Sequence, residues 1–405
     1  MKNHFSALPL KLKQFYQFLS LHSFLVGLFP VLMPSFLWKK GIGLTELSVF
    51  IAISGLGFVV ALSSWETIHN RYSFKRLMII SFLLQIGLMS MFFFQGQFFF
   101  LIGLALLNGM TNCFFWITQR ALFFETIEFG NSGRRFGNMQ IFLALIINIS
   151  IAIGVVLLEQ VGFVGVYTVF FLVAMGAIIY YLLLKNPPTL TKDLVKAMPL
   201  GFKEVLFFSD RWRSEKVFWL DGLFLYLESY FWIISLFLIA RESFLTLGFL
   251  IVSVAGILAI IFYFIKNLID KMHSQIVYLA SVILYAASWG LRAVVDEKLP
   301  LVYLFFLLVS ITFFTSLFRL AYNKRFFDIA QQGSKHRYLF IKSYLSQIFI
   351  MLSFTAIAIT SFLMEGSLLL LKYIYILAIL LSAGYFFYRP REKFHLAHKR
   401  GYKNL

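Results

Sequence analysis

Residues 185–216 read KNPPTLTKDLVKAMPLGFKEVLFFSDRWRSEK and form the longest hydrophilic stretch of the 405-residue chain. The stretch opens with Asn186-Pro187-Pro188, where the prolines cannot continue a preceding helix, and it carries seven lysines and arginines. We interpret it as a linker between two halves of the chain, with a short amphipathic helix around residues 194–208.

On either side of this linker lie six apolar runs, each long enough to cross a membrane. A span needs about 20 apolar residues at about 1.5 Å of rise per residue. The predicted spans are 14–37, 44–69, 76–95, 97–124, 137–160, 162–185, 217–240, 244–267, 275–294, 299–323, 339–364 and 368–388. The composition agrees, because 60% of the residues are hydrophobic and only 13% are charged. The sequence therefore predicts an all-α membrane protein.

Lysines and arginines are shared very unequally among the connections between these runs. Most of the 36 lie at the two termini and in every second connection, whereas the intervening connections hold few. This positive-inside pattern places both termini and the linker in the cytoplasm, and it predicts a multi-pass protein of the cell membrane, with the bacterial inner membrane as the expected location. The net charge of +18 is explained by loops that face anionic lipid headgroups, so nucleic-acid binding is not expected.

A short pattern recurs at one constant offset of about half the chain. The first copy is Phe123-Phe124-Glu125 with Gly130 and Arg134, after the fourth run. The second copy is Phe326-Phe327-Asp328 with Gly333 and Arg337, after the tenth run. We interpret the repeat as the trace of a duplicated six-span unit.

Twelve spans, two matched halves, a basic central linker and both termini inside together resemble the major facilitator superfamily. The family's loop between the second and third spans reads like G-x-x-x-D-R-x-G-R-R. Residues 66–76, ETIHNRYSFKR, keep the basic residues of this motif, replace its acid with Asn70, and lack both glycines. The corresponding loop after the eighth span keeps an acid and a base as Asp270 and Lys271.

The resemblance implies a fold, a set of domain limits and a mode of action. The fold is that of an all-α membrane protein with twelve transmembrane helices in two pseudo-symmetric six-helix halves. The expected limits are 1–185 for the N-terminal half, 186–216 for the cytoplasmic linker, 217–388 for the C-terminal half and 389–405 for a basic cytoplasmic tail. Such proteins move small solutes by rocking two halves around a midplane site. We expect no cofactor, no metal and a monomer.

The resemblance also implies a gating role for charged residues at the cytoplasmic span ends. Glu125 with Arg134, and Asp328 with Arg337, are expected to form matching ion pairs. The further gating candidates are Glu66, Arg71, Lys75, Arg76, Asp270 and Lys271. The alternative is that these residues only set the topology, since surface ion pairs contribute about 0 to 1 kcal/mol each.

Spans one, four, seven and ten line the central cavity in this family, and here they carry polar side chains. In spans four, seven and ten these side chains recur at helical spacing, so each set largely shares one side of its helix. The sets are Asn108, Asn112 and Gln119 with Trp116 and Arg120, then Asp221, Glu228, Trp232 and Ser235, and then Thr312, Ser316, Arg319 and Asn323, while span one contributes His22. Polar stripes facing lipid would be costly, so these are candidate substrate-binding or coupling residues.

Arg319 and Glu228 are the leading candidates, because a buried ion pair is a poor source of stability. We expect Glu228 to pair with Arg319, so that protonation of the carboxylate frees the arginine for an anionic substrate. The alternative for the uncharged residues is interhelical hydrogen bonding. We expect Asp221 to be wet at its span end, Arg120 either to join the site or to snorkel, and His22 either to titrate or to serve as a hydrogen-bonding partner.

The sequence also bears on the class of function. It contains no P-loop, no nucleophile–base arrangement and no cluster of metal ligands, and its single cysteine, Cys113, excludes an internal disulfide. We therefore expect a secondary transporter rather than an enzyme, with a small anionic, zwitterionic or amphiphilic substrate, membrane lipids and protons as its partners. The alternatives are a lipid-handling membrane protein and a silent structural or sensor relative. A cavity lined by Arg319 and Glu228 would support transport, whereas direct packing of the polar stripes would support the silent relative.

Overall fold

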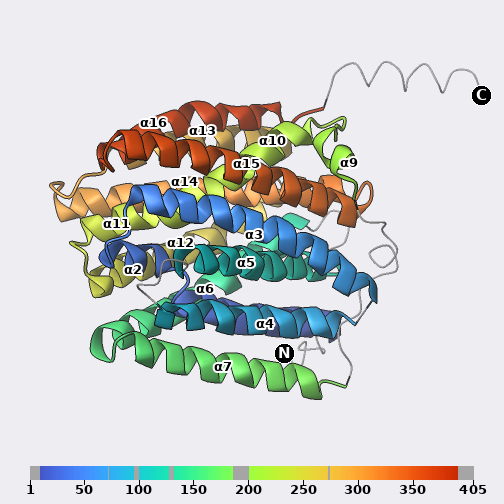
Figure 1. Ribbon diagram of the computed structural model, residues 1–405. Helices are drawn as coiled ribbons and strands as arrows, with labels where there is room; N and C mark the ends of the chain where they lie inside the picture. Colours follow the sequence, from blue (N-terminus) through green and yellow to red (C-terminus); the bar gives the residue numbers. More distant parts are fainter. Residues whose placement is uncertain are drawn as a thin grey trace, which may run out of the picture.

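The computed structural model of the protein describes residues 10–71, 73–94, 100–126, 132–185, 200–271 and 274–390, with the side chains at 10–11, 70, 262–271, 274 and 301 left out. Within these residues the chain forms helices and no strand (Figure 1). Twelve helical segments are long and apolar enough to cross a membrane. The all-α class and the number of spans predicted from the sequence are confirmed, and the chain is a multi-pass membrane protein.

The N-terminal half contains the first six spans. Its helices are α1 (Leu10–Leu28) and α2 (Met33–Lys39), α3 (Leu44–Arg71), α4 (Phe74–Ser90) with η1 (Met91–Phe94), α5 (Phe100–Phe124), α6 (Ser132–Gln160) and α7 (Phe163–Leu183). The first span is divided into α1 and α2 where Pro30, which has no N–H, cannot continue the helix. Pro34 then lies in the first turn of α2, a position that proline tolerates well.

The C-terminal half follows the linker helix α9 (Phe202–Leu206). Its helices are α10 (Ser214–Tyr226), a π-helical turn η2 (Leu227–Phe231) and α11 (Trp232–Ile239), then α12 (Phe244–Lys271), α13 (Ser274–Val294), α14 (Leu301–Ala330), α15 (Lys335–Leu363) and α16 (Leu369–Ser382) with η3 (Ala383–Phe387). The seventh span is therefore continuous but contains one π turn, a feature that is frequent at functional sites.

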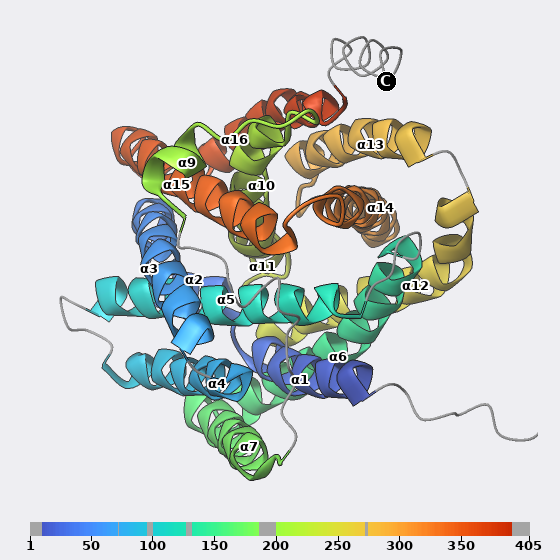
Figure 2. The same ribbon diagram turned by 90° about the vertical axis from the view of Figure 1, so that its right-hand side faces the viewer.

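The two halves face each other along two pairs of helices. Figure 2 shows the bundle end on, with α3 beside α15 and α6 beside α12. Between α3 and α15, the Thr45 hydroxyl donates to Ser361 Oγ at 2.9 Å. Between α6 and α12, Gly248 lies against the side chain of Val155. We call the end of the bundle that carries α9 and the first turns of α10 and α15 the linker end, and the opposite end the far end.

Helices α3 and α5 approach each other closely inside the N-terminal half. A Cβ added to Gly109 of α5 would lie 1.9 Å from the carbonyl oxygen of Ser54, and one added to Gly57 of α3 would lie 2.4 Å from that of Leu106. Small residues at such positions let backbones pack directly, which is a main source of helix association in membranes. The two glycines therefore set how closely α5 can sit against α3.

This close approach leads to a stability prediction. We expect Gly109→Ala to lower the free energy of unfolding by about 1–3 kcal/mol, because the added methyl must push two backbones apart. Gly176→Ala in α7 is the matched control, since a Cβ there meets nothing within 4 Å and alanine favours helix. Unfolding of detergent-solubilised protein measures both, and equal stability of the two variants would contradict the packing described.

Candidate functional site

Four charged side chains meet inside the C-terminal half, and we call them the charge cluster: Asp221, Glu228, Arg319 and Lys342. Arg319 Nη1 donates to Asp221 Oδ1 at 2.6 Å, and Arg319 Nη2 and Nε donate to Glu228 Oε2 at 3.1 and 3.3 Å. Lys342 Nζ lies 2.6 Å from the second oxygen, Oδ2, of Asp221. The predicted pairing of Glu228 with Arg319 is confirmed, and Arg319 holds a second carboxylate as well.

The cluster is built by three helices and supported by a fourth. Asp221 lies on α10 and Glu228 in the π turn that follows, while Arg319 lies on α14 and Lys342 on α15. Tyr285 of α13 donates from its hydroxyl to Glu228 Oε1 at 2.5 Å. Both oxygens of each carboxylate therefore have a partner, as buried carboxylates require.

Burial divides the cluster into two parts. The side chains of Asp221 and Lys342 are only 2% and 3% exposed. Those of Arg319 and Glu228 keep 15% and 17% of their surface exposed. The expectation that Asp221 is wet was wrong: its helix begins at Ser214, so Asp221 lies two turns inside it and is covered by Lys342 and Arg319. Glu228 and Arg319 are therefore the less buried part of the cluster.

Two further arginines add positive charge around the cluster. Arg292 of α13 donates to Ser288 Oγ at 2.8 Å and to Thr315 Oγ1 at 3.0 Å, and it lies over the ring of Trp289. Arg120, at the linker-end part of α5, interacts electrostatically with Asp221 and Arg319 from the other half of the protein. Among these side chains the four cations outnumber the two carboxylates, which leaves a local excess of positive charge.

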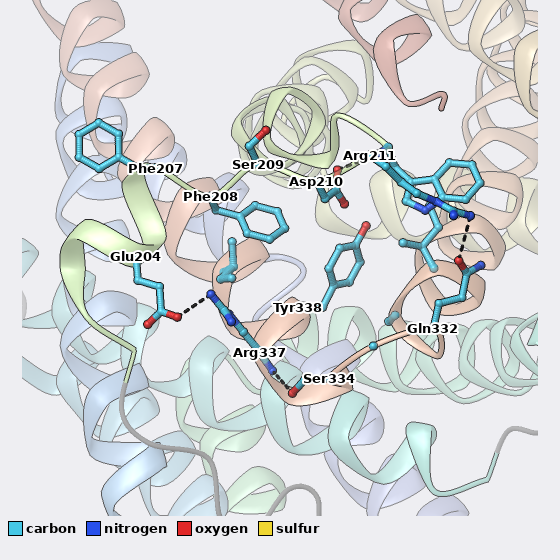
Figure 3. Close-up of a pocket in the computed structure, with 15 residues that line it drawn as sticks. Glu204, Phe207, Phe208, Ser209, Asp210, Arg211, Gln332, Ser334, Arg337 and Tyr338 are labelled. Carbon is cyan, nitrogen blue, oxygen red and sulfur yellow. Dashed lines mark hydrogen bonds and ion pairs between the residues drawn. The ribbon is translucent and has the colours of Figure 1, made fainter. Parts of the chain in front are cut away.

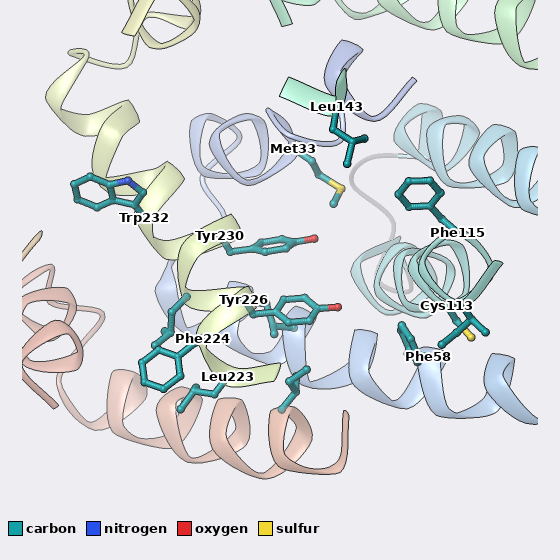
Figure 4. Close-up of a cluster of buried hydrophobic side chains, with 14 of the residues drawn as sticks. Met33, Phe58, Cys113, Phe115, Leu143, Leu223, Phe224, Tyr226, Tyr230 and Trp232 are labelled. Carbon is teal, nitrogen blue, oxygen red and sulfur yellow. The ribbon is translucent and has the colours of Figure 1, made fainter. Parts of the chain in front are cut away.

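The polar stripe of α5 meets the seventh span across the two halves. Asn108 Nδ2 donates to the Tyr230 hydroxyl at 3.0 Å and to Ser54 Oγ at 3.1 Å. Asn112 Nδ2 donates to Asn108 Oδ1 at 3.4 Å on the same helix, and Asn112 also interacts with Tyr226 of the seventh span. Figure 4 shows Tyr226 and Tyr230 pointing together to the side of Phe115. Asn108 therefore forms interhelical hydrogen bonds, which was the alternative considered for these uncharged residues.

The remaining predicted residues of spans four and seven have different surroundings. Trp116 is 40% exposed, one turn from both Asn112 and Arg120 on α5. Gln119 is buried and donates to the Met139 sulfur at 3.0 Å. Trp232 is buried, and the guanidinium carbon of Arg292 lies 5.2 Å from the centre of its ring. In Figure 4 the Trp232 side chain points away from Tyr230.

The predicted stripe of α14 lies partly buried beside the cluster. Thr312 donates to the carbonyl of Leu308 at 2.7 Å, and Asn323 donates to the carbonyl of Arg319 itself at 2.8 Å. Ser316, about one turn before Arg319 and two turns before Asn323, is partly buried as well. Only Arg319 of this stripe makes a cross-helix ion pair with α10 and its π turn.

His22 serves as a hydrogen-bonding partner, which is one of the two roles expected for it from the sequence. Its Nδ1 accepts from Gln85 Nε2 at 2.9 Å, so its Nε2 donates to Ser81 Oγ at 2.7 Å. The ring is fully buried and stacks on Phe115 with centroids 3.8 Å apart. These contacts lie within the N-terminal half, away from the charge cluster, and they connect α1 to α4 and α5.

The two aromatic pairs of the sequence repeat pack on each other at the linker end. Phe123 lies 4.7 Å and Phe124 5.1 Å from the ring of Phe327, and Phe124 lies 6.4 Å from Phe326. Phe136 of α6 adds a contact to Phe327 at 5.7 Å. We call these five residues the aromatic clamp; it joins α5 and α6 to α14 across the two halves.

The prediction of an ion pair between Asp328 and Arg337 was wrong. Asp328 instead pairs with Lys324, one turn earlier on α14, at 2.9 Å, and accepts a hydrogen bond from Ser132 of α6. Arg337 pairs with Glu204 of α9 at 2.5 Å. Span ten was predicted to end at residue 323, whereas α14 continues to Ala330. The extra helical turns place Asp328 one turn after Lys324 on the same side of the helix.

The other gating candidates are placed as follows. Glu66 lies 3.6 Å from His336 of the other half. Arg71 and Arg76 are exposed at the linker end, and Lys75 donates to the carbonyl of Leu182 at 2.6 Å. Glu125 and Arg134 lie on either side of residues 127–131, and their pairing stays a prediction; the side chains of Asp270 and Lys271 lie outside the described residues.

A pocket of about 680 Å³ opens at the linker end, between the linker and the turn from α14 to α15 (Figure 3). The Glu204–Arg337 pair spans one side of it, and Arg211 donates to Gln332 at 3.4 Å on another. Asp210 accepts hydrogen bonds from the N–H groups of Trp212 and Ser214, both at 2.9 Å, at the start of α10. These contacts fasten the described end of the linker to the C-terminal half.

Several residues of the site escaped the sequence reasoning. Lys342, Tyr285 and Arg292 lie on spans eleven and nine, which the resemblance does not assign to the cavity. Tyr226 and Tyr230 look like ordinary aromatic residues of an apolar run. For Lys342 and Arg292 a signal existed, since charge inside a span is costly and marks a function or a partner.

This architecture defines a class of protein, namely a helical membrane protein with twelve candidate spans among its described residues, built from two six-span halves. A family model of the Major Facilitator Superfamily matches residues 18–332, and the chain belongs to that family. It is accordingly a transporter of the secondary type rather than an enzyme. No curated protein sequence matches the chain.

Solved structures of the family share the fold at low sequence identity. A variant of the nucleoside transporter NupG superposes with a TM-score of 0.67 at 12% identity, covering 94% of this chain and 99% of NupG. The human organic anion transporter MFSD10 gives 0.64 at 14%, covering 94% and 100%. The E. coli fucose:proton symporter FucP gives 0.61 at 14%, covering 93% and 97%. At these identities the likeness shows the fold alone.

The buried ion pairs lead to a second prediction. We expect Lys342→Met to lower the free energy of unfolding by about 3–5 kcal/mol, because Asp221 then loses one of its two cations in a dry environment. Lys324→Met should cost only about 0–1 kcal/mol, since its pair with Asp328 is partly exposed. Unfolding in detergent compares the two, and Asp221→Asn combined with Lys342→Met should recover part of the loss. Equal losses in the two single variants would contradict the assignment.

Proposed function

We propose that the protein is a proton-coupled secondary transporter of a small anionic or zwitterionic solute, which binds at Arg319 and Glu228, the less buried part of the charge cluster. The observation that carries the proposal is the excess of cations over carboxylates around Arg319, deep in the bundle. An unpaired charge in this setting is costly. An anion that binds near Arg319 would therefore compensate the excess positive charge of these side chains.

The geometry suggests how a proton and a solute exchange at Arg319. Two of its nitrogens are held by a single oxygen, Glu228 Oε2, while the third is held by Asp221. Protonation of Glu228 would weaken the first contact and leave Asp221 neutralised by Lys342 and Arg319. Arg319 could then offer its fork of donors to a carboxylate or phosphate, a geometry that guanidinium groups match well. Arg120 would approach the same anion from the N-terminal half.

The orientation in the membrane follows from charge. The linker end carries most of the basic loops, so it is proposed to face the cytoplasm of a bacterial cell, with both chain termini on that side. The aromatic clamp and the α3–α15 contacts then close the cytoplasmic side, and rocking of the two halves opens it. We propose that the protein works as a monomer, since each half finds its partner within one chain.

The experiment is uptake into proteoliposomes, with and without a pH gradient. The panel should compare neutral fucose and neutral nucleosides with small organic carboxylates and organic phosphates. The names of the structural neighbours give fucose, nucleosides and organic anions as their solutes. The charge cluster predicts that the anions are transported and that an inward proton gradient accelerates their uptake. Transport confined to neutral sugars or nucleosides would contradict the proposal.

Variants of the cluster sharpen this test. We expect Arg319→Ala to lower the initial rate at least about tenfold, because a hydrogen bond between charged groups contributes about 1.5–3 kcal/mol. Glu228→Gln should keep exchange of the solute but lose acceleration by the proton gradient. Arg389→Ala and Glu365→Gln, which change exposed residues, are the matched controls. If both cluster variants transported like the wild type, the site assignment would fail.

One observation favours a second candidate, a relative that does not transport. Arg319 and Glu228 touch each other directly, as they would in a sealed and purely structural bundle. In such a protein the whole panel would give no uptake, and Glu228→Gln would alter stability alone. Their residual exposure is the reason for preferring transport.

A further inference from the structure

The four members of the charge cluster balance one another, so the excess positive charge comes from two arginines outside it. Two carboxylates are paired with two cations within the cluster. The surplus lies on Arg120 of α5 and Arg292 of α13. Arg120 interacts electrostatically with Asp221, the more buried acid, and Arg292 with Glu228, the less buried one. Arg292 is therefore the surplus cation beside the less buried part of the cluster.

Arg292 lies beyond Arg319 in the direction of the far end. It belongs to the last turn of α13, and its Nη1 and Nη2 donate to two neutral hydroxyls, those of Ser288 and Thr315. Thr315 comes four residues before Arg319 on α14, which begins at the far end. Four residues of helix rise about 6 Å, or about one turn. The two arginines are therefore offset by about one helical turn along α14.

Two buried N–H donors at Arg292 have no acceptor among the described residues. They are Nε of Arg292 itself and Nε1 of Trp289, whose ring centre lies 4.3 Å from the guanidinium carbon. Arg292 is 4% exposed and Trp289 is fully buried. Buried donors are nearly always hydrogen-bonded, and a buried cation without a carboxylate is costly. What this position lacks is an acceptor that carries negative charge.

Two indole rings hold the Arg292 guanidinium in place. Trp289 of α13 lies at 4.3 Å and Trp232 of α11 at 5.2 Å, both in cation–π contact. A guanidinium fixed by two rings and two hydroxyls loses little freedom when it binds a ligand. The same contacts would also suit an arginine that only ties these helices together. The unmet donors and the missing carboxylate favour a ligand over that structural role.

We propose that Arg292 and Arg319 bind the two ends of one solute, and that this solute is a small dicarboxylate. One carboxylate takes the donors of Arg319 once Glu228 is protonated, and the other meets Arg292 and Trp289. The offset of about one turn suits two acidic groups joined by a short chain. A monoanion leaves Arg292 without a counter-charge, and a zwitterion brings a second cation to it. The inference rests on the proposed function and narrows its solute.

The first test uses the wild-type protein in proteoliposomes. Succinate, glutarate and adipate are each compared with their monomethyl esters at about pH 7.5, where carboxylates are ionised, after subtraction of uptake by protein-free liposomes. Each ester has nearly the size of its diacid but one charge fewer. We expect the preferred diacid to enter at least about tenfold faster than its ester, because hydrogen bonds between charged groups are strong. Equal rates for every pair would overturn the proposal.

Variants then assign the preference to Arg292. Arg292→Gln should lower the ratio of diacid to ester uptake at least about tenfold, and Arg292→Lys should restore part of it. Thr315→Val removes only a hydroxyl that holds the guanidinium, so it should lower the ratio by a smaller factor and serves if Arg292→Gln does not fold. Arg241→Gln removes an exposed positive charge after α11 and should leave the ratio unchanged. A ratio that survives in Arg292→Gln, or that falls equally in Arg241→Gln, would contradict the assignment.

The outcomes separate this inference from the proposed function. If neither the diacids nor the esters nor any other anion entered, the proposed function would fail and this inference with it. If diacids and esters entered alike, and their uptake still depended on Arg319 and Glu228, only the assignment of a dicarboxylate to Arg292 and Arg319 would fail.

Discussion

The bonds of Arg319 to Asp221 and Glu228 are the interaction on which the rest of the structure depends. A guanidinium in the middle of an apolar bundle must be matched by carboxylates, and here the two acids come from α10 and its π turn. Lys342 and Tyr285 then occupy the remaining carboxylate oxygens, which draws α15 and α13 onto the same point. The C-terminal half is thereby organised around one polar centre.

The N-terminal half has no equivalent centre among its described residues. Its buried polar contacts are hydrogen bonds, such as those of His22 with Ser81 and Gln85. It meets the charged half through the α5 asparagines, through Arg120 and through the phenylalanines of the repeat. This asymmetry leaves the buried charges mainly in the C-terminal half, and under the proposed function that half recognises the charge of the solute while the two halves rock as matched bodies.

Hydropathy and the charge census predicted the spans, the two halves and the cross-helix pairing of Glu228 with Arg319. They succeeded because lipid imposes its constraint on every residue of a span. Asp221 was misjudged because its burial depends on where α10 begins and on Lys342, which lies on another span. Asp328 was misjudged because α14 extends beyond its apolar run. Which helix faces meet depends on the packing between helices, and the spacing of residues along a single helix does not specify that packing.

The most direct measurement of the central claim is the proton balance of anion binding. Purified protein in weakly buffered detergent would be titrated with a transported anion while a pH indicator follows the solution. We predict uptake of about one proton per bound anion near neutral pH, lost in Glu228→Gln, because Arg319 must leave Glu228 to bind the anion. Anion binding without any proton uptake, or with uptake unchanged in Glu228→Gln, would contradict the role given to this pair.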